Sequence, residues 1–160
     1  MTTPTREYVF EILHSMDDEA AFFAKMGKFF ASAAVRRECG GYPLNDGLRY
    51  RWFTVRHTNS TRILGFISIE KLLDVVRIRE GYIRAEVRNR GLFRELRARV
   101  LAYIDNLGLA AKVQVRQSSV PFLTPHGFQV QGTRGNWVTL RRSEYASRRR
   151  IAEPSHSAIS

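Results

Sequence analysis

The sequence has little cysteine and no long apolar run. Its single cysteine, Cys39, excludes an intramolecular disulfide and offers no cluster for a metal ion. No segment approaches the roughly 18 consecutive apolar residues that a membrane-spanning helix requires, and no apolar leader follows Met1. We therefore expect an unsecreted cytoplasmic protein with no metal and no membrane partner.

Acidic residues and lysine are also scarce. Aspartate and glutamate together number 15, against 26 lysines and arginines, and the formal net charge is +11. Nearly all of these cations are arginine, whose planar guanidinium suits bidentate contacts to phosphates and base edges. The composition predicts double-stranded DNA as a partner. An arginine-rich but merely solubilising surface is the alternative.

At 160 residues the chain is long enough to bury a core without disulfides or metals. We expect one domain over residues 1–142. The segment 143–160 contains Arg148, Arg149 and Arg150 and is otherwise small and polar, so it predicts a basic, flexible tail. Monomer and homodimer both remain open.

Hydrophobic periodicity predicts a mixture of strands and helices. Two short helices are expected before Cys39, with Ser15 or Asp17 as the first cap. A longer helix is expected from Leu92 to about Asn106, ended by Gly108. Its core face would carry Leu92, Leu96, Val100, Tyr103 and Leu107. Strands are expected at 6–13, 51–56, 63–69, 75–84, 112–116, 128–131 and 137–140, and the segment from strand 75–84 to strand 112–116 predicts a right-handed crossover with a parallel pair.

The segment from Val87 to Leu96 is the most informative stretch. It reads Val-Arg-Asn-Arg-Gly-Leu-Phe-Arg-Glu-Leu, in which an expected strand gives way to a helix. The first N–H groups of a helix and its dipole favour an anion at such a turn, so a phosphate or pyrophosphate site is predicted. A solvated turn before a surface helix is the alternative. Gly81, inside the preceding strand, indicates a bulge or a close backbone approach.

Three motifs in this order resemble the GNAT superfamily of acyl-CoA-dependent N-acyltransferases: Leu64-Gly65-Phe66, Arg88-x-x-Gly91 and Gly127-Phe128. The resemblance covers about residues 6–142. It implies an α/β (α+β) fold with a mixed, mostly antiparallel sheet, a central splayed parallel strand pair and flanking helices. It also implies acetyl-CoA or another acyl-CoA as donor. The positions implied to hold the donor are Tyr82, Ile83 and Arg84 for pantetheine, and Arg88, Asn89, Arg90, Gly91, Leu92 and Phe93 for the pyrophosphate.

Two positions depart from the family pattern. Phe93 stands where the motif has a second small residue. Leu123 stands where many members have a tyrosine that protonates the departing thiolate. Ser118 and Ser119 follow the expected strand and are candidates to hydrogen-bond a thiolate or an oxyanion, although two serines after a strand also form ordinary turns.

The arginine-rich body and the segment from Phe30 to Leu44 are similar to GNAT-like Mom-type proteins of phages and prophages. That family modifies the exocyclic amine of adenine in DNA and protects it against restriction. The resemblance implies DNA modification in a host cytoplasm. Two alternatives remain: an ordinary GNAT acting on a protein or small amine, and a DNA-binding module without enzymatic activity.

An adenine exocyclic amine is a poor nucleophile because it is conjugated with its ring. An enzyme that acts on it needs a hydrogen-bond acceptor, precise placement and a flipped base. Glu80 and Asp46 are candidate acceptors, and Tyr42 and Trp52 could stack on the base, with surface or core roles as the alternative. The candidate catalytic residues are Ser118, Ser119, Glu80, Asp46 and Tyr42. The candidate nucleic-acid contacts are Arg36, Arg37, Arg49, Arg51, Trp52, Arg148, Arg149 and Arg150.

Overall fold

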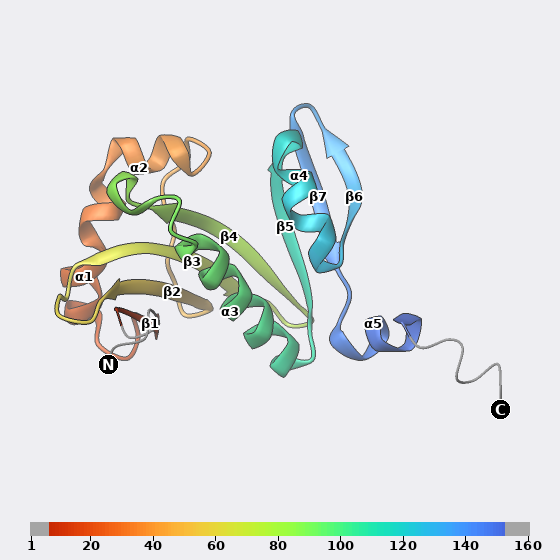
Figure 1. The fold of residues 1–160 in the computed structure, drawn as a ribbon, viewed down its shortest axis with the longest axis horizontal. Coiled ribbons are helices and arrows are strands. Elements are labelled where there is room, and N and C mark those ends of the chain that lie inside the picture. Colours follow the sequence, from red (N-terminus) through yellow and green to blue (C-terminus); the bar gives the residue numbers. More distant parts are fainter. Residues whose placement is uncertain (1–6, 153–160) are drawn as a thin grey trace. The chain divides into compact units, whose positions relative to one another are not determined.

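The computed structural model describes residues 7–152, and Figure 1 labels its helices and strands. The chain forms two compact units. The first unit comprises Met1–Lys71 and Arg79–Val100, and the second comprises Leu72–Ile78 and Leu101–Ser160. The elements in order are β1 (Tyr8–Leu13), α1 (Glu19–Ala31), α2 (Ala33–Glu38), β2 (Tyr50–His57), β3 (Ile63–Lys71), β4 (Val75–Ile83), η2 (Ala85–Val87), α3 (Leu92–Leu107), β5 (Ala110–Arg116), η3 (Gln117–Ser119), α4 (Val120–Leu123), η4 (Thr124–His126), β6 (Phe128–Arg134), β7 (Trp137–Arg142) and α5 (Tyr145–Ala152).

The strands follow the order β1-β2-β3-β4-β5-β7-β6. The pairs β1–β2, β2–β3, β5–β7 and β6–β7 are antiparallel, whereas β4 and β5 are parallel. The parallel pairing joins Val75–Ile78 to residues 110–113, although β4 continues to Ile83 and β5 to Arg116. The predicted mixed, mostly antiparallel sheet with one parallel pair is confirmed.

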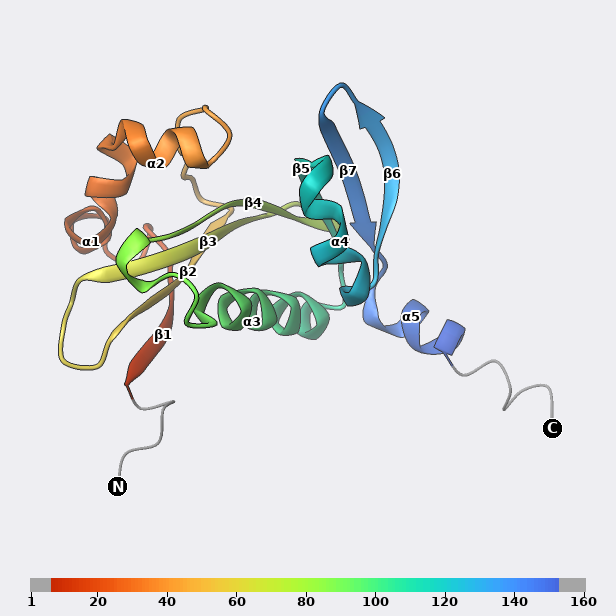
Figure 2. The ribbon, with the colours of Figure 1, turned by 45° about the horizontal axis from the view of Figure 1, so that its top comes forward.

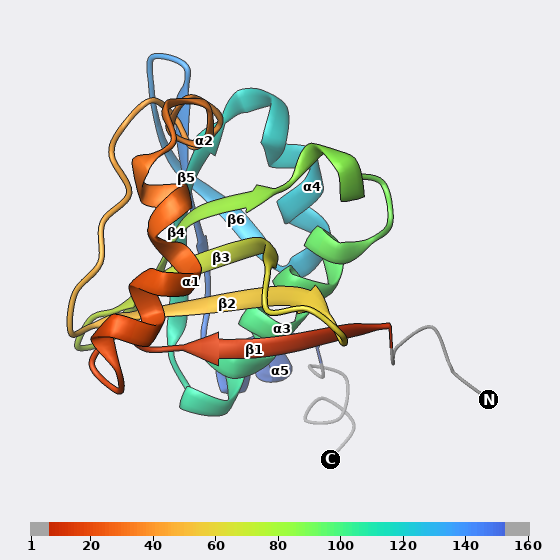
Figure 3. The same cartoon turned by 90° about the vertical axis from the view of Figure 1, so that its left-hand side faces the viewer.

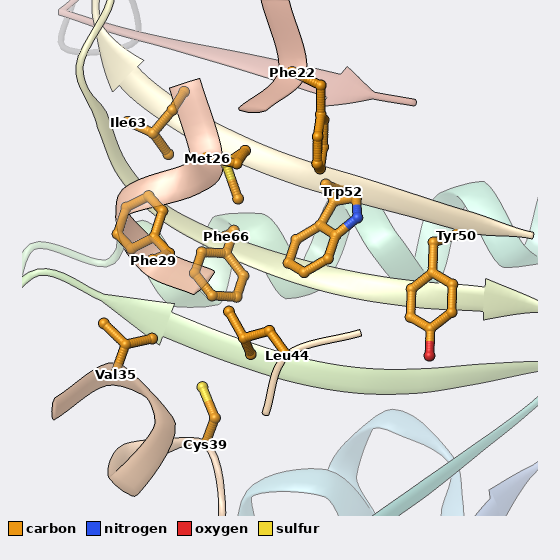
Figure 4. Packing of buried hydrophobic residues seen from close by; sticks show 10 residues of the cluster. All are labelled: Phe22, Met26, Phe29, Val35, Cys39, Leu44, Tyr50, Trp52, Ile63 and Phe66. Atoms are coloured by element: carbon orange, nitrogen blue, oxygen red, sulfur yellow. The ribbon is translucent and has the colours of Figure 1, made fainter. Parts of the chain in front are cut away.

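The first unit is built around an aromatic core between helix and sheet. In Figure 3, α1 crosses one face of β2 and β3, and α3 begins on the other face. Asp18 caps α1 through a 3.0 Å bond from Ala21 N–H to Asp18 Oδ1, so the cap lies one residue beyond the predicted Asp17. Figure 4 shows the cluster that fills this layer: Phe22, Met26, Phe29, Val35, Cys39, Leu44, Tyr50, Trp52, Ile63 and Phe66.

Helix α3 has the predicted bounds within one residue, but its buried stripe differs at the C-terminal end. Leu92, Leu96 and Val100 are buried as expected. The stripe then continues through Ile104, which is fully buried, while Leu107 is 38% exposed. At 100° per residue, Leu107 has the same angular position as this stripe, but it is the last residue of α3 and stands directly before Gly108, so its exposure follows from its place at the helix end.

In the second unit, β7 lies between β5 and β6 (Figure 2). Residues 117–126 form η3, α4 and η4. One expectation for this unit is wrong: residues 145–152 form the helix α5 where a flexible tail was expected. Residues 153–160 lie outside the described part of the chain.

Helix α5 is attached through one carboxylate of α3. Asp105 accepts from Arg142 at 2.8 Å and 3.2 Å and also from Arg148 of α5. Arg142 is buried, and its Nε donates to the carbonyl of His126 at 2.7 Å. This network supplies the order that composition alone would not predict for a basic tail.

Candidate functional site

A pocket of about 440 Å³ opens in the first unit where β4 ends and α3 begins. Three elements contribute to it: the end of β4, the loop that follows η2, and the first turn of α3. Glu38, the last residue of α2, closes one side. The lining residues are Glu38, Gly81, Tyr82, Ile83, Val87, Arg88, Asn89, Gly91, Leu92, Phe93 and Arg94.

The start of α3 presents backbone donors to this pocket. The first helical bond runs from Glu95 N–H to Gly91 O at 3.0 Å. Within residues 7–152, the N–H groups of Leu92, Phe93 and Arg94 have no backbone partner. Gly91 has φ +77° and Asn89 has φ +65°, a left-handed conformation that glycine adopts freely and asparagine tolerates. Such donors, together with the helix dipole, are suited to hold an anion.

Arg88 is a cation of the pocket that is held by three contacts. Its Nε donates to Ile83 O at 2.9 Å, and its Nη2 donates to Glu38 Oε2 at 2.6 Å. The guanidinium also lies over the Tyr82 ring, 5.6 Å from the centroid. Both charged side chains of the ion pair are roughly half exposed, so an incoming anion competes with Glu38 for Arg88.

Phe93 and Gly81 contact each other inside the pocket. A Cβ placed on Gly81 would lie 2.7 Å from Phe93 Cε1, so only glycine leaves room for the ring. The sequence predicted a bulge or a close backbone approach at Gly81, whereas the close neighbour in the structure is the side chain of Phe93. The bulky residue that departs from the motif covers the backbone of β4, and it remains 39% exposed to solvent.

Glu80 and Cys39 lie beside this pocket, and the pKa of each is raised. Burial raises the pKa of Glu80, and the charge of Arg79 partly opposes that shift. Burial raises the pKa of Cys39 to about 12, and the charges of Glu80 and Glu38 add to the effect. The thiol donates to Gly81 O at 3.6 Å. Cys39 is therefore protonated at neutral pH and is not a nucleophile, whereas Glu80 is suited to accept a proton closer to neutrality than an ordinary glutamate.

The Glu80 shift predicts a pH-dependent stability. Because the pKa is raised in the folded state, the stabilisation is complete below the ordinary glutamate pKa and is lost as pH rises through the raised value. Glu80→Gln should remove this dependence. Urea unfolding of both proteins between pH 4 and pH 8 should show wild type losing stability relative to the variant as pH rises. A difference that does not change with pH would contradict the shift.

The pocket contains most, but not all, of the predicted donor-binding residues. Arg84 and Arg90 do not line it: Arg84 Nε donates to Ile63 O at 2.8 Å, and Arg90 Nη1 donates to Tyr8 Oη at 3.3 Å. The prediction missed Glu38, whose distant position in the sequence gave no signal. It also missed Gly81, Val87 and Arg94 as lining residues, although Gly81 and Arg94 flank the predicted segment.

The prediction that Trp52 stacks on an extruded base is wrong. Trp52 is fully buried in the aromatic core (Figure 4) because β2 is an inner strand covered by α1. Its Nε1 donates to Asp46 Oδ1 at 2.9 Å, so Asp46 has a structural partner. Tyr42 is 70% exposed in the loop before β2, and its catalytic role remains a prediction.

The predicted nucleic-acid arginines are dispersed. Arg36 donates to Phe30 O at 3.1 Å, and Arg51 donates to Leu48 O and Tyr50 O, so both support the local backbone. Arg37 and Arg49 are exposed. In the second unit Arg148 pairs with Asp105 and Arg149 lies against the ring of Tyr145. The side chain of Arg150 lies outside the described residues.

Ser118 and Ser119 lie in η3 of the second unit, where Ser118 is exposed and Ser119 is partly exposed. Leu123 ends α4 in the same unit. The roles predicted for the two serines remain predictions. Across residues 7–152 no group of three or more His, Cys, Asp or Glu side chains is arranged to hold a metal ion. No helix in this range is long and apolar enough to cross a membrane.

Comparison with solved structures identifies the class of fold as that of the GNAT N-acetyltransferases. No family model and no curated protein matches the sequence. Escherichia coli ElaA aligns with a TM-score of 0.63 at 16% identity, over 85% of this chain and 99% of ElaA. The ribosomal-protein-S18-alanine N-acetyltransferase of E. coli aligns with a TM-score of 0.61 at 14% identity, over 85% and 93%. The PaiA N-acetyltransferase of Thermoplasma acidophilum, solved with coenzyme A, gives a TM-score of 0.54 at 13% identity, over 84% and 99%.

Proposed function

We propose that the protein is an acyl-CoA-dependent N-acyltransferase that binds the donor diphosphate at the start of α3. The observation that carries the proposal is the row of free N–H groups at Leu92–Arg94, beside Arg88 and Arg94 in one pocket. Oriented backbone donors, a helix dipole and two guanidinium groups together suit a diphosphate. The shared fold supports a CoA thioester as its source.

In the proposed reaction, the acceptor amine attacks the thioester carbonyl. A carbon–nitrogen bond forms, the carbon–sulfur bond breaks, the amine loses one proton and CoA leaves as its thiol. Glu80 is the proposed proton acceptor, because its raised pKa suits general-base chemistry. Arg88, Arg94 and the α3 donors hold the phosphates and do not take part in proton transfer.

The donor site is tested by binding. Isothermal titration with CoA should give saturable one-to-one binding, and Arg88→Ala with Arg94→Ala should weaken it at least tenfold, because two charge-assisted contacts are lost. Lys28→Ala with Arg62→Ala removes the same charge outside the pocket and should leave affinity unchanged. If wild type does not bind CoA, the protein is not an acyl-CoA enzyme and a non-enzymatic module is favoured.

For the acceptor, we propose an amine of a nucleic-acid base, with adenine modification of the Mom type as the most specific form. The net charge of +11 supports a polyanionic acceptor. Expression in cells, digestion of their DNA to nucleosides and mass spectrometry should reveal a heavier adenine nucleoside. Unmodified DNA together with acylated peptide or polyamine would instead favour an ordinary N-acetyltransferase, which the fold accommodates equally well.

A further inference from the structure

The strands of the second unit have an unusual charge distribution. The segments Ala110–Arg116, Phe128–Arg134 and Trp137–Arg142, together with the residues of β4 in this unit, contain no aspartate or glutamate. They nevertheless carry six cations. Like charges on neighbouring strands repel each other, so this excess of cations destabilises the sheet unless an anion binds there.

The strand register brings five of these cations to one face of the sheet. Lys112 is the cross-strand partner of Arg141 and, on its other side, of Arg77. Trp137 is likewise the partner of both Arg116 and Arg134. Directly paired residues project from the same face, and residues two apart along a strand do so as well. We call this the basic sheet face; it comprises Arg77, Lys112, Arg116, Arg134 and Arg141.

The sixth cation, Arg142, lies on the other face of the sheet, and that face is buried. Arg142 alternates with Arg141, is buried, and pairs with Asp105 of α3. Its neighbours on that side, Val138 and Leu140, are also buried. The α3 side of the sheet is therefore the packed side, and the basic sheet face is the opposite one.

The members of the basic sheet face are accessible and carry uncompensated charge. Arg77, Arg116 and Arg134 are exposed, and Lys112 and Arg141 are partly exposed. Within residues 7–152 none of the five forms an ion pair. Five unneutralised cations on one surface favour a polyanion, because binding releases its condensed counterions.

One contact indicates which polyanion fits. The guanidinium of Arg116 lies over the Trp137 ring, 4.8 Å from its centroid. The guanidinium occupies one side of the partly exposed ring, so this face offers charge to phosphates more readily than an aromatic platform to unpaired bases. A duplex carries one charge per about 1.7 Å of its axis and keeps its bases stacked inside. We propose that the basic sheet face binds the phosphate backbone of double-stranded DNA.

This inference extends the proposed function by assigning a surface to the acceptor, and it is tested without CoA, so each can fail separately. The variant Lys112→Gln, Arg116→Gln, Arg141→Gln should bind a short DNA duplex roughly tenfold to a hundredfold more weakly than wild type, measured by fluorescence anisotropy. The slope of log affinity against log salt should fall by about one per cation that contacts phosphate.

The matched control is Lys28→Gln, Arg62→Gln, Arg99→Gln, which removes three cations of the first unit. It should bind the duplex within about threefold of wild type. Equal weakening in both variants would show a net-charge effect and overturn the assignment. Unchanged affinity in the Lys112, Arg116 and Arg141 variant would also overturn it. So would wild type binding a single strand or an RNA duplex more tightly than the DNA duplex, or binding polyglutamate comparably. Matching thermal melts of the three proteins establish that each is folded.

Discussion

Replacing Phe93 by alanine should tighten CoA binding roughly fivefold to thirtyfold. In the structure the Phe93 ring lies on the β4 backbone at Gly81, next to the donors that start α3. A ligand anchored there that extends an arm along β4 must displace the ring. Moving a partly buried phenylalanine ring out of its contacts costs roughly 1–2 kcal/mol, and this cost lowers the apparent affinity for the ligand, because only molecules with the ring displaced can bind it.

The measurement is isothermal titration of wild type and Phe93→Ala with two ligands. CoA contains the pantetheine arm, whereas 3′-phospho-ADP has the phosphates but no arm. Only CoA should bind more tightly to the variant. Phe23→Ala is the control, because Phe23 is 41% exposed in α1 and does not line the pocket. Equal tightening of both ligands, or none, would show that the ring does not obstruct the arm.

Replacing Asp105 by alanine should destabilise the protein by roughly 3–5 kcal/mol. Asp105 is the shared carboxylate of Arg142 and Arg148, and Arg142 is 7% exposed. Removing the carboxylate leaves a guanidinium buried without its counter-charge, which costs far more than a lost surface pair. It also detaches α5, whose Arg148 loses its contact with α3.

Urea unfolding checks this loss, with Glu95→Ala on the same helix as control. Glu95 pairs with Arg99 at 2.9 Å, but both side chains are about half exposed, so the expected loss is about 0.5 kcal/mol or less. Similar losses in the two variants would show that the Asp105 network adds no more than a surface ion pair. Hydrogen exchange should show faster exchange in α5 of the Asp105 variant alone.

Much of the fold was predictable because its signals are local. Short runs rich in apolar and aromatic residues indicated β2 and β3, and the crossover from β4 to β5 followed from the helix between them. The C-terminal region was predicted less well. The composition predicted a basic tail. In the structure Arg148 donates to Asp105, which lies 43 positions earlier in the sequence, and a local sequence pattern cannot predict such a distant partner.

Most of the residues predicted to hold the donor line the pocket, whereas several other predicted site residues do not. Arg88 and Gly91 lie where the motif placed them, since a strand-to-helix turn exposes backbone donors whatever follows. For Trp52 the sequence left a stacking role and a core role open, and burial decides for the core, because both faces of an inner strand can be covered.

By itself, the sequence determined most of the strands and helices, the strand-to-helix turn at the start of α3 and the excess of arginine, because each is a property of neighbouring residues. Only the tertiary structure decided that Glu38 pairs with Arg88, that Phe93 covers Gly81 and that five cations share one sheet face. These depend on register and packing between distant segments. A shift of one residue in β5 or β7 would have turned the same cations toward α3.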